Sequence, residues 1–158
     1  MAEHSIPVVD LAPFAHGDSA ARARVAAEVA SACERSGFLV VRGHEVAAES
    51  VERLRAAAGE FFALPLESKL IVRRPRDDQN RGYIPYGEET LVRMHGGDSP
   101  PDFKEVFAIG PDELPDEPYF TGPAAYPSFA PNLWPQAPAD LRPAMRAYFA
   151  AMESLMTL

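Results

Sequence analysis

Residues 32–44 read ACERSGFLVVRGH, and this stretch decides the fold because a helix must end and a strand must begin within it. The preceding residues, from about Ala20 to Ser36, follow a helical period, with Val25 on the apolar face. Gly37 is the residue type that ends a helix in the left-handed conformation. The apolar run from Phe38 to Val41 then predicts a short buried strand.

Toward the N-terminus, Ile6–Leu11 reads IPVVDL and predicts another short strand. Pro7 confines that strand to a sheet edge or to its own first residues, because proline has no N–H to donate to a sheet. A polar stretch follows, and within it Asp18 or Ser19 can accept a hydrogen bond from the free amides of the next helix.

Toward the C-terminus, a second helix is predicted from about Ala48 to Ala63, and Leu64-Pro65 ends it. Pro65 can open a short third helix that runs through Lys69. Residues 73–102 are rich in Arg, Asp, Gly and Pro and are predicted to be mostly loop.

The last third of the chain alternates short regular elements with proline-rich loop. Glu105 to Ile109 resembles a strand, and eight prolines between Gly110 and Pro138 predict a long irregular segment. Within it, Trp134 is expected to anchor the segment and Asn132 to bond the local backbone. A final helix begins near Ala139, and its apolar stripe consists of Leu141, Met145, Tyr148, Met152 and Leu155. Together these elements predict an α+β fold in which helices pack on a few short strands.

Composition excludes several classes of protein. The chain has 158 residues, 47% of them hydrophobic, which suits one domain with a modest core. Its net charge of −8 disfavours a nucleic-acid partner, and Arg73, Arg74 and Arg76 are interpreted as a solvated loop. Cys33 is the only cysteine, so no disulfide framework is expected, and the thiol is predicted to be a small buried side chain. No apolar run could span a bilayer and no signal peptide is visible, so a cytoplasmic location is expected.

Seven short pieces, in their order along the chain, resemble the N-terminal region of the non-haem Fe(II)/2-oxoglutarate-dependent dioxygenase superfamily, the isopenicillin N synthase type. The pieces are Ile6–Leu11, Ala32-Cys33, Gly37–Val41 with His44, Phe61–Pro65 with Lys69, Arg81–Tyr83, Asp102–Phe107 and Asn132–Pro135. The resemblance implies one dioxygenase N-terminal domain over residues 1–158, with about 5–125 matching best. It also implies the N-terminal portion of a jelly-roll (double-stranded β-helix) fold whose catalytic, iron-binding core is absent from the chain.

Proteins of this family hold Fe(II) with a His-x-Asp pair and a distal His, and they grip 2-oxoglutarate with Arg-x-Ser. The only His-x-Asp is His16-Gly17-Asp18, which is better explained as a turn and a helix cap. His4 lies near the terminus, His95 lies in a glycine-rich loop, and His44 follows a strand where the family commonly has a histidine with no metal role. No Arg-x-Ser occurs. We therefore expect no catalytic residue and no metal ligand here, with Fe(II) and 2-oxoglutarate bound only if a C-terminal half is supplied.

The resemblance assigns substrate contact to Arg81 and Tyr83, because the corresponding loop lies near the mouth of the active site in such proteins. Arg81 would supply a fixed cation, and Tyr83 an apolar ring with a polar tip. The alternative is structural: Tyr83 packs on the sheet, and Arg81 pairs with a nearby carboxylate such as Glu88 or Glu89.

The apolar stripe of the final helix continues into its last turn before Leu158, which suggests a surface that needs covering. One hypothesis is a truncated or split oxygenase whose partner, in cis or in trans, is the C-terminal jelly-roll half. The assembled enzyme would oxidise an unactivated C–H bond of a small molecule with O₂, usually coupled to 2-oxoglutarate decarboxylation. Without that half the chain would lack the iron and 2-oxoglutarate ligands and be inactive, and its unpaired strand edges would make it marginally stable and prone to association. The alternatives are an iron-free binding or interaction module and a complete small enzyme with its own nucleophile or metal.

Overall fold

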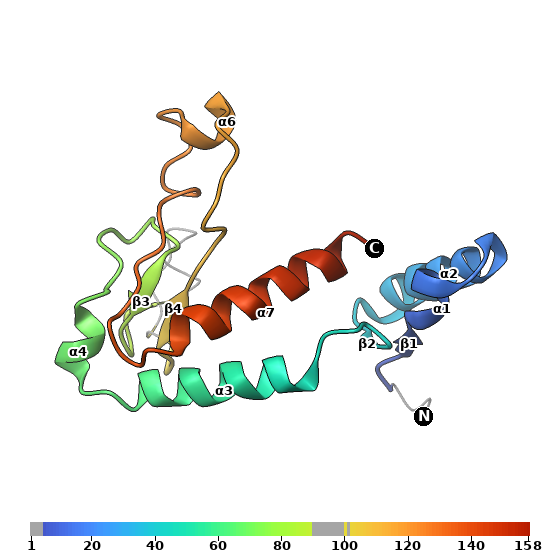
Figure 1. The fold of residues 1–158 in the computed structure, drawn as a ribbon, viewed down its shortest axis with the longest axis horizontal. Helices are drawn as coiled ribbons and strands as arrows, with labels where there is room; N and C mark the ends of the chain where they lie inside the picture. Colours follow the sequence, from blue (N-terminus) through green and yellow to red (C-terminus); the bar gives the residue numbers. More distant parts are fainter. Residues whose placement is uncertain (1–4, 90–99, 101) are drawn as a thin grey trace. The chain divides into compact units, whose positions relative to one another are not determined.

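The computed structural model describes residues 5–89, 100 and 102–158, and helices mix with a few short strands, as the α+β prediction requires (Figure 1). The chain forms two compact units: unit 1 comprises Met1–Val51 with Ala147–Leu158, and unit 2 comprises Glu52–Arg146. The described elements are β1 (Val8–Asp10), α1 (Ala12–His16), α2 (Ser19–Ser36), β2 (Val40–Arg42), α3 (Ala48–Phe62), α4 (Leu66–Leu70), β3 (Gly82–Ile84), β4 (Val106–Ala108), α6 (Pro118–Thr121) and α7 (Leu141–Met156).

The long helix α2 of unit 1 begins and ends where the sequence predicts. The Asp18 side chain accepts a hydrogen bond from the backbone N–H of Ala21 at 2.8 Å, so it caps one of the free amides of the first turn. Gly37 ends the helix in the left-handed region, with φ of 71°. Both signals are therefore confirmed.

The strands β1 and β2 form a two-stranded parallel sheet in which Val8 is paired with Val40 and Val9 with Val41. Val9 is buried and α2 packs against β1, whereas Val8 and Val40, on the other face, are exposed. The prediction of a buried strand over Phe38 to Val41 is wrong on two counts. The strand begins at Val40, and in the described part of the chain only one face of the sheet is covered.

Two further features of unit 1 differ from prediction. The helix α1 was not expected, although Pro13 suits a first helical turn and the Asp10 carboxylate accepts a hydrogen bond from the N–H of Ala12 at 3.0 Å. Cys33 is exposed, so its predicted burial is wrong. The neighbouring Ala32 takes the buried position on α2 instead.

Unit 2 has its own apolar core, built from α3, β3 and the first turns of α7. The Phe61 ring, fully buried, lies at its centre, 4.8 Å from the ring of Phe107 and 5.9 Å from that of Tyr83. The buried members of the core are Ala57, Phe61, Val72, Tyr83, Leu141 and Ala144. Because these residues come from distant parts of the sequence, the core joins α3 to the hairpin and to α7.

The strands β3 and β4 form an antiparallel pair, with Tyr83 opposite Phe107. The prediction that residues 73–102 are mostly loop is therefore wrong at Gly82–Ile84, because three residues are too few for an alternating pattern to be visible. Residues 90–99 and 101 of that loop lie outside the described residues. The strand predicted at Glu105 to Ile109 is confirmed, and residues 110–138 are irregular apart from the single turn α6.

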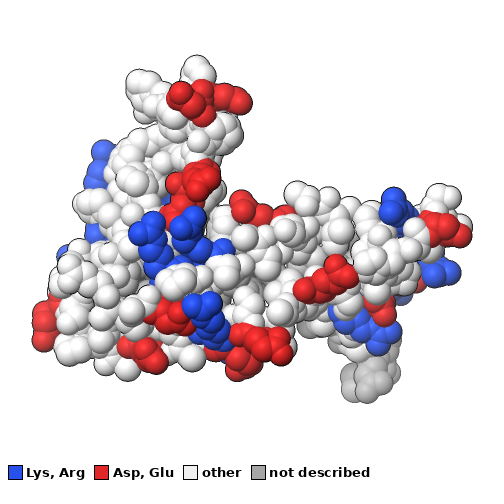
Figure 2. Space-filling model, in the orientation of Figure 1, with Lys and Arg blue, Asp and Glu red and all other residues white. Residues whose placement is uncertain are grey.

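Charged side chains are largely paired. On the face that Figure 2 shows, Lys and Arg side chains lie beside Asp and Glu. In the predicted arginine loop, Arg73 bonds Glu88 at 2.8 Å and Arg76 bonds Asp78 at 2.7 Å, and both arginines are exposed as expected. Arg74 departs from that prediction because its side chain is mostly buried.

Two glycines provide a matched test of the left-handed helix end. An added Cβ would meet no atom within 4 Å at Gly37 or at Gly59, and only Gly37 has positive φ. Gly37→Ala is expected to lower the free energy of unfolding by about 1 kcal/mol. Gly59→Ala, within α3, is expected to raise it by up to about 1 kcal/mol. Urea unfolding followed by circular dichroism measures both, and changes of the same sign would contradict the assignment.

Candidate functional site

A buried polar cluster lies at the centre of unit 2 and joins three distant segments. The ammonium of Lys69, in α4, donates to one carboxylate oxygen of Glu105, Oε2, at 2.7 Å, and the Tyr83 hydroxyl donates to the same oxygen at 2.5 Å. Lys69 also donates to the carbonyl of Phe62 at 3.0 Å, at the end of α3. We call Lys69, Tyr83 and Glu105 the Glu105 cluster.

The charges in the Glu105 cluster are balanced. Burial alone would raise the pKa of Glu105, but the hydrogen bonds from Lys69 and Tyr83 outweigh it and leave that pKa lowered. Burial raises the pKa of the Tyr83 hydroxyl, and its bond to Glu105 raises it further. At neutral pH Tyr83 is therefore a donor and Glu105 an ionised acceptor, an arrangement that holds structure and makes Glu105 a weak general base.

Arg81 is also buried, with 7% of its surface exposed. Its guanidinium donates to the carbonyls of Asn80 and Ser128, the latter at 2.9 Å, and its Nε has no partner in the described part of the chain. Burial lowers its pKa. Gly110 lies directly against it, since an added Cβ there would collide with the guanidinium.

Of the structural alternative for Arg81 and Tyr83, the part about Tyr83 is confirmed and the part about Arg81 is wrong. Tyr83 packs in the core, as that alternative requires. Arg81 does not pair with Glu88 or Glu89, because Arg73 and Lys104 take those carboxylates, each at 2.8 Å. Both predicted site residues are brought into one unit and both bond protein groups, while their contact with a substrate stays a prediction.

The proline-rich segment is anchored at Gly110. The Asn132 side chain accepts from the N–H of Gly110 and donates to its carbonyl, each at 2.8 Å, so it bonds backbone as predicted, but 22 positions away and not locally. Asp112 accepts from the Asn132 amide at 2.6 Å and from the Trp134 indole at 3.3 Å. Arg146 pairs with the same carboxylate at 3.0 Å, and these bonds lower the pKa of Asp112 against the effect of its burial.

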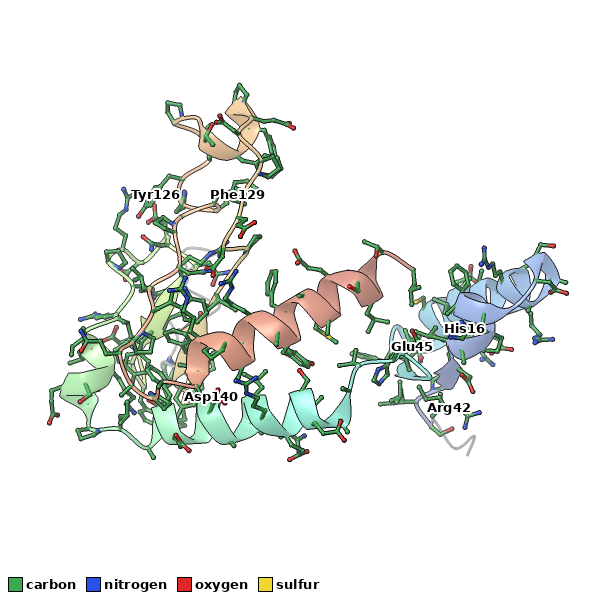
Figure 3. The ribbon with its side chains drawn as sticks, in the orientation of Figure 1. His16, Arg42, Glu45, Tyr126, Phe129 and Asp140 are labelled. Atoms are coloured by element: carbon green, nitrogen blue, oxygen red, sulfur yellow. The ribbon has the colours of Figure 1, made fainter. Side chains whose placement is uncertain are left out.

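The described histidines do not fit an iron site. His16 lies beside Glu45, with Nε2 2.6 Å from the carboxylate (Figure 3), while Asp18 caps α2. His44 uses Nδ1 to accept from the N–H of Val46 at 3.1 Å. Among the described residues no group of three or more His, Cys, Asp or Glu could hold a metal. His4 and His95 lie outside the described residues.

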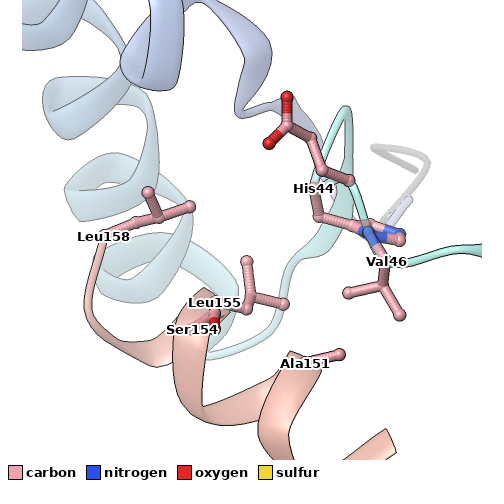
Figure 4. Close-up of a pocket in the computed structure, with 7 residues that line it drawn as sticks. His44, Val46, Ala151, Ser154, Leu155 and Leu158 are labelled. Carbon is pink, nitrogen blue, oxygen red and sulfur yellow. The ribbon is translucent and has the colours of Figure 1, made fainter. Parts of the chain in front are cut away.

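A hollow of about 350 Å³ lies in unit 1 (Figure 4). Its lining residues are His44, Glu45, Val46, Ala151, Ser154, Leu155 and Leu158. Polar and aliphatic side chains both line it, and the Ser154 hydroxyl is already bonded to the carbonyl of Ala150 at 3.1 Å. The described lining residues include no cluster of three or more metal ligands.

A family profile described as "non-haem dioxygenase in morphine synthesis N-terminal" matches residues 6–137. The chain belongs to this family. Three of the sequence pieces that carry the resemblance, those around Lys69, Tyr83 and Glu105, meet in the Glu105 cluster. In this member of the dioxygenase N-terminal family, some residues of the family pattern therefore hold the interior of unit 2 together.

Curated relatives and solved structures agree with the family. A "2-oxoglutarate-Fe(II) type oxidoreductase hxnY" of Emericella nidulans is 34% identical over 140 residues, which cover 89% of this chain and 38% of the relative. Validamycin A dioxygenase of Streptomyces hygroscopicus subsp. limoneus is 34% identical over 150 residues, covering 94% and 39%. The solved structure of a 2OG-Fe(II) oxygenase family protein from Caulobacter crescentus has a TM-score of 0.72 and 25% identity, covering 96% and 45%. The chain thus spans about two fifths of the length of these relatives and matches their N-terminal part.

The sequence did not reveal which residues of this family member meet. Lys69 and Glu105 lie 36 positions apart, and neither an amphipathic period nor a local motif links them. Their only signal was their place in the family order. Within the described chain no helix is long and apolar enough to cross a membrane. The cytoplasmic location stays a prediction.

Breaking the Glu105 cluster is expected to destabilise unit 2. Lys69→Met leaves the Glu105 carboxylate without its cation, and we expect a loss of about 3 kcal/mol in the free energy of unfolding, the low end for a buried pair. The low end applies because 27% of the Glu105 side chain is exposed. Tyr83→Phe removes one charged hydrogen bond and should cost about 2 kcal/mol. Urea denaturation measures both. Lys104→Met, which removes the ion pairs of the exposed Lys104 with Glu89 and Asp102, is the control and should change little.

The lowered pKa of Glu105 predicts a pH dependence of stability. Since the folded pKa lies below the ordinary value of 4.5, the stabilisation is fully present above pH 4.5 and is lost as pH falls through the folded pKa. Urea unfolding between neutral and acid pH should show this loss in the natural chain. Glu105→Gln should show a shallower decline below pH 4.5, and an identical decline would contradict the role of Glu105.

Proposed function

We propose that this chain is the N-terminal, scaffold and substrate-side part of an isopenicillin N synthase-like Fe(II)/2-oxoglutarate-dependent oxygenase, and that it is inactive alone. The main support for this proposal is how much of this chain and of each relative the alignments cover. The alignments take in about nine tenths of this chain and about two fifths of each relative. Nearly all of this chain is matched, but it accounts for less than half of each relative. We therefore interpret it as one part of a larger catalytic unit.

The side-chain chemistry supports a scaffold role. The polar residues of the family pieces bond one another or the backbone, as Lys69, Tyr83 and Asn132 do. The described histidines have other partners and fit no iron site. The proposal therefore assigns Fe(II) and 2-oxoglutarate to a complementary jelly-roll part, in cis or in trans.

The proposal also assigns Arg81 and Tyr83 to the substrate side. Both side chains are buried, so we infer that they act by holding the segment that follows them, residues 85–89. Arg81 bonds the carbonyl of Ser128, and Tyr83 bonds Glu105, so the hairpin is fixed at both its entry and its return. The relatives' names imply oxidation of a small molecule by O₂ with 2-oxoglutarate as co-substrate.

The test is to purify residues 1–158 and measure Fe(II) binding by calorimetry and 2-oxoglutarate turnover. We expect neither, because the described residues provide no triad of ligands. Tight stoichiometric Fe(II) binding would overturn the proposal. His16→Ala would then show whether the His16–Asp18 pair is responsible. At the gene locus, we expect coding sequence for His-x-Asp, a distal His and Arg-x-Ser; its absence would favour the iron-free interaction module.

A further inference from the structure

The hairpin of unit 2 extends beyond its two short strands. The N–H of Asp102 donates to the carbonyl of Glu89 at 2.8 Å, so the two arms stay together past the end of β3. We call residues 82–89 and 102–108 the stem. On it, the rings of Tyr86 and Phe103 stack, with centroids 5.9 Å apart and planes inclined by 18°. We call these two residues the aromatic pair.

The aromatic pair is exposed, unlike the other aromatic residues of the stem. Tyr86 is 62% exposed and Phe103 is 83% exposed, whereas Tyr83 is buried and Phe107 packs against the core. Exposed apolar rings held together on a rigid support are typical of a binding surface.

The charges around the aromatic pair identify the kind of ligand. Lys104 bonds Glu89 at 2.8 Å and Asp102 at 3.2 Å, and Arg73 takes Glu88. Every charged side chain that the structure describes on the stem is thus paired. Among the described residues of the stem, the surface that these ion pairs leave for a ligand is therefore the faces of the two rings.

We propose that the aromatic pair is the specificity-determining contact that this part makes with the prime substrate, and that it takes a flat, uncharged ring. The inference rests on the proposed function. At 5.9 Å the two rings leave no room for a third between them, so the ligand ring stacks on an outer face. The Glu105 cluster holds the stem through Tyr83, which keeps the pair in one place and lowers the entropic cost of binding.

The test uses caffeine, a flat uncharged ring system, as a probe of the 158-residue chain, with cyclohexanol as the non-planar control. Saturation-transfer NMR and a shift titration measure binding. We expect caffeine to bind and cyclohexanol not to. Because the ligand stacks on one outer face, we expect at least one of Tyr86→Leu and Phe103→Leu to weaken caffeine binding by about tenfold, the loss typical of one stacking ring.

Tyr119→Leu is the matched control, because Tyr119 is 72% exposed and packs only with Phe120 and Phe129 among the described rings. It should leave caffeine binding unchanged, and circular dichroism should show all three variants folded. The inference is overturned if the natural chain binds no caffeine. It is also overturned if Tyr119→Leu weakens binding equally, or if neither variant of the pair weakens it.

This experiment needs neither iron nor 2-oxoglutarate, so its failure is distinct from failure of the proposed function. If the chain binds both caffeine and Fe(II), the inference about the aromatic pair is supported and only the proposed scaffold role is contradicted. Loss of ring binding with the oxygenase assignment intact would move substrate recognition elsewhere.

Discussion

The carboxylate of Glu105 is the constraint on which unit 2 depends. It accepts the Lys69 ammonium and the Tyr83 hydroxyl on one oxygen, and Lys69 also holds the last turn of α3 through the carbonyl of Phe62. Three segments far apart in the sequence therefore meet at one atom. Because a buried ammonium or hydroxyl left unpaired would cost free energy, these bonds favour the arrangement in which the core around Phe61 closes.

Other polar residues of the family pieces are likewise bonded to the protein itself. The Asn132 amide is used at Gly110, and the Arg81 guanidinium is used at the carbonyl of Ser128. Each bond connects the proline-rich segment to a residue next to the hairpin. This segment forms no described strand, so sheet hydrogen bonds do not make that connection. In this irregular segment, side chains supply hydrogen bonds to backbone groups that a helix or sheet would otherwise supply. The atoms used in these bonds are not free to bind a ligand.

Local signals predicted the regular elements well and the long-range contacts poorly. The cap at Asp18 and the stop at Gly37 act within a few residues, so the sequence was sufficient for α2. The exposure of Cys33 and of Val40 depends on which face another element covers, which periodicity in α2 or β2 cannot state. Arg81 illustrates the same limit, because one of its two partners is the backbone carbonyl of Ser128, which lies 47 positions away.

Two of the exposed apolar surfaces among the described residues, the outer face of β1–β2 and the aromatic pair, differ in their chemistry. The outer face of β1–β2 presents aliphatic side chains, Val8 and Val40, on a sheet that has only two described strands. An aliphatic surface on a two-stranded sheet suits another protein segment, which can supply both a strand and apolar cover. The aromatic pair is too small for that and lies among charges that are already neutralised. The β1–β2 face would thus suit the assembly that the proposed function requires, and the aromatic pair would suit the ring recognition that we infer from the structure.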